Sequence, residues 1–136
     1  MKVMLKSGAY MPERAHSADA GYDLRTPVNV YVPANGSAVV DTGVCMAIPE
    51  GYVGFLKSKS GQNVKYDLTG EGVIDSGFAG SITVKLYNHG NEGYLFNCGD
   101  KLIQIVLLPI FTPELELVER LDDSERGCNG FGSTGK

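Results

Sequence analysis

The chain has 136 residues, a length that suits one domain with a single hydrophobic core. Its net charge is −4, with 12 basic residues spread among 16 acidic ones, which excludes the broad basic surface of a duplex nucleic-acid binder. No stretch approaches the roughly 20 apolar residues that span a bilayer, so no association with a membrane is expected.

The cysteines indicate the compartment. Cys45, Cys98 and Cys128 are odd in number, lie far apart and lack the CxxC or paired-His spacing of a zinc site. The N-terminal residues contain no sustained apolar run typical of a secretory leader. We therefore expect a reducing, intracellular setting, the cytoplasm, or the host nucleus or cytoplasm if the gene is viral.

Apolar patterning predicts an all-β fold of many short strands separated by turns. Segments 28–32, 82–87 and 114–118 alternate apolar and polar residues, which is typical of half-buried strands, and the other predicted strands are more uniformly apolar. Only 62–67 offers a short helix, of about one or two turns. In chain order, the strands are predicted at residues 28–32, 38–48, 52–56, 82–87, 102–110 and 114–118. This pattern favours a sandwich, jelly roll or small barrel.

The last residues have a different composition. After Val118 the apolar pattern stops, and the tail is rich in glycine and charge with a lone aromatic, Phe131, so it cannot build core. Taken alone, such a tail is more often a frayed terminus without function. The alternative is a phosphate clasp, because glycine N–H groups can converge on phosphate oxygens while Arg126 and Ser133 add hydrogen bonds.

Asp75 is the candidate catalytic carboxylate. It lies in GVIDSGFAG (72–80), between two apolar segments that resemble the arms of a hairpin. An aspartate in a turn often only caps it. The functional alternative is a base that aligns and deprotonates a water for attack on phosphorus.

Three further segments carry polar groups next to predicted strands. KSKSG (57–61) offers two cations, two hydroxyls and a glycine N–H, although a solvated strand end would have a similar composition. Asp23 is a single carboxylate, which could suffice for Mg²⁺ because that ion keeps much of its water. Gln104 follows a turn at the start of a core strand and is otherwise read as an exposed strand residue.

In their order along the chain, these segments resemble the five motifs of the dUTPase family. The third and fifth are the most specific, and the resemblance covers nearly the whole chain. The five are AGYDL at 20–24, KSKSG at 57–61, GVIDSGFAG at 72–80, GDKLIQ at 99–104 and RGCNGFGSTG at 126–135.

The resemblance implies a jelly-roll-like, distorted β-barrel that hydrolyses dUTP to dUMP and pyrophosphate with Mg²⁺. It further implies a homotrimer whose active sites are shared between subunits, with residues 1–120 as the barrel and 121–136 as a flexible arm that closes the site. Such an enzyme limits uracil incorporation into DNA and supplies dUMP for dTTP synthesis.

The resemblance also assigns roles to individual residues. Asp75 would activate the water that attacks the α-phosphorus in line, Phe78 would stack on deoxyribose and exclude a 2′-hydroxyl, and Asp23 would reach Mg²⁺ through water. The hairpin would read uracil, with Thr69 nearby, and Phe131 would cap the base. The substrate-binding residues implied are Lys59, Ser60, Gly61, Thr69, Gly72, Val73, Ile74, Phe78, Thr83, Gln104, Arg126, Phe131, Gly132 and Ser133.

The chain departs from the family pattern at several positions, of which Lys59 is the most serious. It replaces a common Arg, and because Lys cannot fork two parallel bonds to phosphate, weaker binding or slower turnover is predicted. Phe78 replaces a common Tyr and keeps the stacking face. Two alternatives remain: a dCTP deaminase-like enzyme, which would need a glutamate where Ala79 stands, and a noncatalytic nucleotide-sensing or protein-binding module of the same fold.

Overall fold

The computed structural model describes residues 1–124 and 126–128. Strands dominate this part of the chain, and one short helix, α1 (Ser60–Tyr66), interrupts them. The strands are β1 (Val3–Leu5), β2 (Gly21–Arg25), β3 (Val30–Val32), β4 (Ser37–Asp41), β5 (Val44–Met46), β6 (Tyr52–Lys57), β7 (Leu68–Ile74), β8 (Thr83–Asn88), β9 (Tyr94–Phe96) and β10 (Lys101–Pro109).

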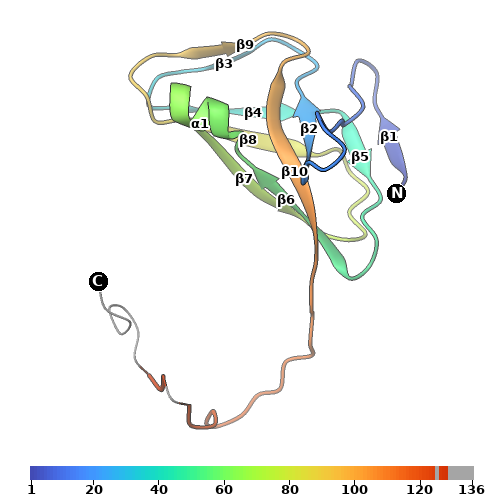
Figure 1. The fold of residues 1–136 in the computed structure, drawn as a ribbon, viewed down its shortest axis with the longest axis vertical. Coiled ribbons are helices and arrows are strands. Elements are labelled where there is room, and N and C mark those ends of the chain that lie inside the picture. Colours follow the sequence, from blue (N-terminus) through green and yellow to red (C-terminus); the bar gives the residue numbers. More distant parts are fainter. Residues whose placement is uncertain (125, 129–136) are drawn as a thin grey trace.

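Six of the strands form one curled, antiparallel sheet in the order β2-β10-β6-β7-β8-β4. Two small antiparallel sheets, β1-β5 and β3-β9, complete the half-barrel shape (Figure 1). The predicted all-β class is therefore confirmed. The long strand β10 lies between β2 and β6, and it connects residues that are far apart in the sequence.

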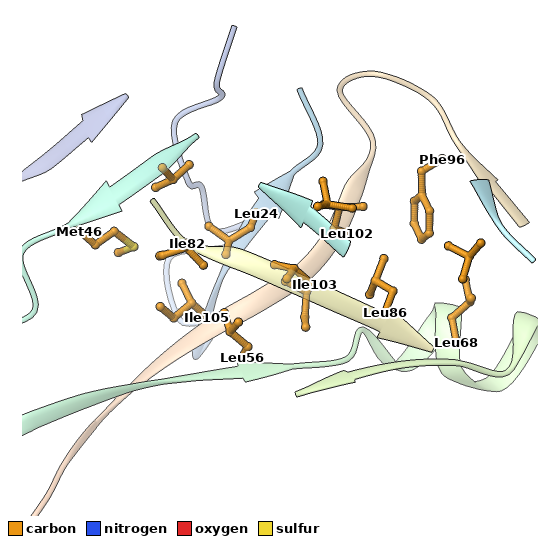
Figure 2. Close-up of a cluster of buried hydrophobic side chains, with 14 of the residues drawn as sticks. Leu24, Met46, Leu56, Leu68, Ile82, Leu86, Phe96, Leu102, Ile103 and Ile105 are labelled. Atoms are coloured by element: carbon orange, nitrogen blue, oxygen red, sulfur yellow. The ribbon is translucent and has the colours of Figure 1, made fainter. Parts of the chain in front are cut away.

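The core lies inside the curl of the sheet. In β8, alternate side chains point inward: Val84, Leu86 and Asn88 are buried while their neighbours are exposed, as period-two patterning requires. Figure 2 shows how side chains from β2, β6, β8 and β10 meet in this core. The largest fully buried apolar side chains are Phe96, Leu24, Leu68, Ile82, Leu86, Leu102, Ile103 and Ile105.

Five of the six predicted strands are confirmed, one of them with a change. The segment 38–48 forms two strands because the chain turns at Thr42 and Gly43, where Gly43 adopts φ +70°. The predicted short helix at 62–67 is α1, which begins two residues earlier. Strands β1, β2, β7 and β9 were not predicted as such.

The predicted strand at 114–118 is wrong for the single chain. Residues 110–118 have no regular structure, and the chain leaves the sheet after Pro109 (Figure 1). Leu115 and Leu117 are 96% and 100% exposed, since no neighbouring strand of the described chain pairs with them. Period-two patterning shows that a strand could be half-buried, but a partner strand must be present to bury it.

Two further observations concern the cysteines and the possibility of a membrane span. Cys45, Cys98 and Cys128 are all free. Among the described residues, no helix is long and apolar enough to cross a membrane.

Candidate functional site

Asp23, Lys59 and Lys101 form a cluster of buried and half-buried charges. Lys59 Nζ donates to Asp23 Oδ1, and Lys101 Nζ lies 2.6 Å from Asp23 Oδ2. The Asp23 side chain is only 8% exposed, whereas the two lysine side chains are 28% and 35% exposed. One carboxylate thus holds two ammonium groups at the edge of the core, which leaves the cluster with a net positive charge.

Strand register explains why these residues meet. Gln104 on β10 is the partner of Asp23 on β2 and, on its other side, of Lys57 on β6. The first, second and fourth motifs therefore lie side by side across three strands. Gly21 allows this close packing, because a Cβ there would lie 2.3 Å from the Gln104 side-chain oxygen.

Electrostatics favour an ionised Asp23. Burial raises the pKa of Asp23, but the hydrogen bonds from Lys101 and Lys59 outweigh burial and bring the pKa below its ordinary value of 3.8. The carboxylate therefore stays charged at neutral pH and keeps both ammonium groups in place. Neither lysine has another carboxylate partner among the described ion pairs, so each can turn toward an added anion.

Polar contacts hold the turn from β6 into α1 beside this cluster. Gln62 Nε2 donates to the Lys101 carbonyl at 2.5 Å, and Gln104 Nε2 donates to the Ser58 carbonyl at 3.4 Å. Ser60 and Gly61 lie at the start of α1, with open space around Gly61. A cavity of about 390 Å³ opens here. Its lining residues are Arg25, Lys59, Gln62, Tyr94, Phe96, Asp100 and Lys101.

Arg25 and Lys101 are therefore site residues that sequence reasoning did not select. They are register partners on β2 and β10, and the Arg25 guanidinium donates to the Gly99 carbonyl at 2.8 Å. Lys101 lies inside the fourth motif, and Arg25 directly follows the first. The sequence showed a basic residue in or beside each of these motifs. That the two residues line one cavity follows only from the pairing of β2 with β10.

The third motif forms an open hairpin mouth between β7 and β8. These strands pair only from Leu68 opposite Asn88 to Gly70 opposite Leu86. Beyond that point β7 pairs with β6 as far as its end, while β8 pairs with β4 as far as Thr83. Residues 72–73 and Thr83 therefore face each other across the mouth, and no strand pairing joins them.

Asp75 and Phe78 occupy a turn at the tip of this mouth. The Phe78 N–H donates to the Asp75 carbonyl at 3.3 Å, and Gly77 supplies the φ of +81° that such a turn requires. The Asp75 side chain is exposed, and the Phe78 ring rests against the backbone of Gly80, where a Cβ would lie 2.6 Å from the ring. The turn thus presents a carboxylate and an aromatic face.

A larger cavity, about 490 Å³, lies between Phe78 and strands β1 and β5. Its described walls are mostly apolar and include Val3, Met46 and Ile48, with Lys2 at the rim as a charged residue. The cationic cavity at Lys59 and Lys101 is smaller but has the chemistry that a polyphosphate needs.

The remaining predicted site residues have varied positions. The Thr69 hydroxyl lies in the paired half of β7, 2.8 Å from His89 Nε2 and away from the mouth. Arg126 follows the sheet in the C-terminal segment and is exposed. Phe131, Gly132 and Ser133 lie outside the described residues.

In the described chain, no hydrogen bond or ion pair joins Asp75 or Phe78 to the cluster of Asp23, Lys59 and Lys101. The register explains this separation. Asp75 directly follows Ile74, which pairs with Gly54 on β6. Lys57, which is level with Asp23 because both pair with Gln104, lies at the C-terminal end of β6. At about 3.3 Å per residue and about 4.8 Å per strand, Asp75 and Asp23 are on the order of 20 Å apart in a flat sheet, because β10 and β6 lie between their strands.

Comparison with known proteins agrees with these motifs. A family model described as dUTPase matches residues 8–135. A deoxyuridine 5′-triphosphate nucleotidohydrolase of Yarrowia lipolytica is 42% identical over 136 residues, covering 98% of this chain and 87% of the relative. One from Solanum lycopersicum is 41% identical over 132 residues, covering 96% and 78%.

Solved structures give the same result. The Staphylococcus bacteriophage 80alpha dUTPase with dUpNHpp superposes with a TM-score of 0.92 at 36% identity, covering 99% of this chain and 98% of that one. A mutant dUTPase from phage phi11 of S. aureus, in which a structural Mg(II) ion is coordinated, has a TM-score of 0.81 at 36% identity and covers 88% and 96%. By sequence, motif order and fold, the chain belongs to the dUTPase family.

Proposed function

We propose that this chain hydrolyses dUTP to dUMP and pyrophosphate, with Asp75 as the base that activates the attacking water. Family membership supports the reaction, and the exposed Asp75 carboxylate at the tip of an open hairpin supports the role. The carboxylate would orient a water and accept its proton as the oxygen attacks the α-phosphorus and pyrophosphate leaves.

The hairpin mouth is the proposed site for the nucleoside. Gly72, Val73 and Thr83 have no strand partner across the mouth, so their backbone there can hydrogen-bond a flat base much as a further strand would, with Ile74 in the same limb. The Phe78 ring then faces the sugar, where it leaves no room for a 2′-hydroxyl. We place Thr69 in a secondary role, because its hydroxyl already lies 2.8 Å from Nε2 of His89, the residue that follows β8.

The cationic cavity is the proposed phosphate site. Lys59 and Lys101 supply charge, Ser60 and Gly61 supply hydrogen-bond donors, and Gln104 holds the turn after β6 beside them. Arg126, Phe131, Gly132 and Ser133 belong to the fifth motif, which we propose closes over the nucleotide as a flexible arm from residue 121 onward.

Asp23 fits Mg²⁺ held mainly by substrate and water once Lys59 and Lys101, which contact its two oxygens, turn toward the phosphates. No group of three or more His, Cys, Asp or Glu side chains in the described residues could form a protein cage for a metal. Asp23 alone would reach the ion through water. Bound there with the phosphates, Mg²⁺ would neutralise charge on the leaving pyrophosphate.

We propose that the active site is shared between subunits of a homotrimer. A base and its phosphate-binding partners must contact the same phosphoryl group, within about 3 Å of it. Asp75 and the cluster of Asp23, Lys59 and Lys101 are on the order of 20 Å apart within one chain. If the Asp75 turn of one chain lies beside the lysine cluster of another, both can contact the same substrate.

The test compares Asp75→Asn with a matched control. Asp67→Asn is the control, because Asp67 is also an exposed aspartate, at the C-terminal end of α1, and its φ of +52° is one that asparagine adopts readily. We expect Asp75→Asn to lower pyrophosphate release from dUTP by about 10²-fold or more at unchanged folding. Equal activity of the two variants, or ammonia release from dCTP by the unmodified protein, would contradict the proposal.

A further inference from the structure

Asp41 forms a hydrogen-bonded clasp with Ser81. Ser81 lies in the segment that leads from the Asp75 turn into β8, which we call the outgoing limb of the hairpin mouth. The Ser81 hydroxyl donates to Asp41 Oδ1, which also accepts the Gly43 N–H at 2.9 Å. Lys6 Nζ lies 3.1 Å from Asp41 Oδ2. Asp41 ends β4 and Ser81 lies just before β8, so this side-chain bond links two strand ends outside their ladder.

Backbone bonds next to the clasp fix the limb only from Ile82 onward. The Thr42 N–H and hydroxyl both donate to the Ile82 carbonyl, at 3.0 and 2.8 Å, and the Ile82 N–H donates to the Val44 carbonyl at 2.8 Å. Ile82 is fully buried. Within residues 75–81, Ser81 is the residue whose side chain is hydrogen-bonded to another element of the described structure.

The clasp is adjacent to the aromatic ring of the mouth. The Phe78 ring rests on Gly80, where an added Cβ would lie 2.6 Å from one ring carbon and 3.0 Å from another. Gly80 directly precedes Ser81. The position of the Gly80 backbone, and hence of the surface that supports the ring, therefore depends on where Ser81 is held.

We propose that Asp41 is a positioning residue for sugar discrimination: by holding Ser81 it places the Gly80 backbone on which the Phe78 ring rests. The inference depends on the proposed function, in which that ring excludes the 2′-hydroxyl. If the clasp is lost, the ring gains freedom to move away and a ribonucleotide fits more easily. In the proposed site Asp41 would touch neither the substrate nor the reacting atoms.

The charge of Asp41 suits this task. The hydrogen bonds from Ser81 and from the Gly43 N–H lower the pKa of Asp41 to about 2, with a further contribution from Lys6. Asp41 therefore stays ionised as an acceptor across the pH range in which an enzyme works. Hydrogen bonds to a charged acceptor are stronger than neutral ones, which makes the clasp able to order an exposed segment.

The test uses two side chains of nearly the same shape at position 81. Ser81→Thr keeps the hydroxyl that donates to Asp41, and Ser81→Val removes it. Ser37→Ala, an exposed serine on β4, serves as the control for removing a hydroxyl elsewhere on the same pair of strands. Hydrogen exchange of the amides in 75–81 and the ratio of kcat/KM for dUTP and UTP are measured for each variant, and thermal unfolding checks the fold.

We expect Ser81→Val and Asp41→Asn to speed exchange of the 75–81 amides and to lower the dUTP/UTP ratio by about ten-fold, as the loss of one charge-assisted hydrogen bond suggests. KM for dUTP should change more than kcat. Ser81→Thr and Ser37→Ala should retain both the exchange rates and the ratio.

Folded Ser81→Val protein with wild-type exchange and a wild-type ratio would overturn the proposal. So would faster exchange with an unchanged ratio, because the clasp would then order the segment without setting specificity. If the wild-type protein itself hydrolysed dUTP and UTP equally, the proposed role of Phe78 would fail and the specificity role of Asp41 with it. Exchange rates would still report whether the clasp orders the segment, so the two failures are distinguishable.

Discussion

At the scale of single residues, Lys59 stands where the resemblance to the dUTPase motifs implies an arginine, and the structure shows how this lysine is held. Lys59 and Lys101 share one buried carboxylate, that of Asp23. A lysine cannot fork two bonds to a phosphate, but two lysines that line one cavity would give the proposed phosphate site two separate ammonium donors. The predicted cost of Lys59 is thus reduced if Lys101 also contacts phosphate.

Lys101→Met tests this cooperation. The variant removes the Lys101 ammonium and leaves the buried Asp23 carboxylate with Lys59 as its remaining ion-pair partner. We therefore expect a loss of about 1–3 kcal/mol in the free energy of unfolding. We also expect a rise of about ten-fold in KM for dUTP. Urea unfolding and steady-state kinetics measure the two effects.

The control is Lys57→Met. Lys57 contacts Glu71 at 2.9 Å, but the two side chains are 52% and 75% exposed, so the pair contributes less than about 1 kcal/mol. If both lysine variants behaved alike, the special role of the Asp23 cluster would be refuted.

At the scale of elements, the hairpin mouth depends on where β7 and β8 separate. Gly70 is the last residue of β7 that pairs with β8, and its backbone closely approaches that strand. A Cβ at Gly70 would lie 3.0 Å from the Lys85 carbonyl and 3.1 Å from Leu86 Cδ2. The residue with no side chain therefore sets the point from which the two limbs diverge.

Gly70→Val should push the strands apart at this point. Because the Lys85 carbonyl belongs to a paired strand and cannot easily move, we expect overpacking to cost about 1–3 kcal/mol in the free energy of unfolding. Gly61→Val is the control, since nothing lies within 4 Å of a Cβ there and valine is a better helix residue than glycine. Urea midpoints of the two variants should differ clearly, and equal midpoints would count against the close approach at Gly70.

At the scale of the whole molecule, a single chain leaves large apolar side chains without cover. Phe111, Leu115, Leu117 and Leu121 are between 82% and 100% exposed. Exposed apolar residues in such a series are typical of a surface that another chain covers. This agrees with the proposed trimer, in which the alternating segment 114–118 would gain the neighbour that it lacks in one chain.

Deleting residues from Arg126 onward tests the division into barrel and arm. We expect the shortened chain to keep the fold and to remain a trimer in light scattering, because the buried core cluster is built from residues that precede the deletion. Turnover of dUTP should fall by about 10²-fold, since the fifth motif is lost. Unfolded or monomeric protein would contradict the division, and undiminished turnover would contradict the role of the arm.

The sequence by itself determined the strand-rich class, five of the six strands that were predicted, the short helix and the family, because these depend on local patterning and on ordered motifs. It missed β1, β2, β7 and β9, of which β1 and β9 have three residues each and so show too little periodicity to be detected. It also placed a strand at 114–118, where patterning is present but no neighbouring strand is available in the described part of one chain.

Only the tertiary structure decided which charges meet. Lys101 and Arg25 line the same cavity, the proposed phosphate site, because β2 pairs with β10, and Asp41 reaches Ser81 because β4 ends beside the outgoing limb of the mouth. The bond from Lys59 to Asp23 joins residues 36 positions apart in the sequence, and the bond from Ser81 to Asp41 joins residues 40 positions apart. Strand order and register, which depend on packing of the whole core, place them together.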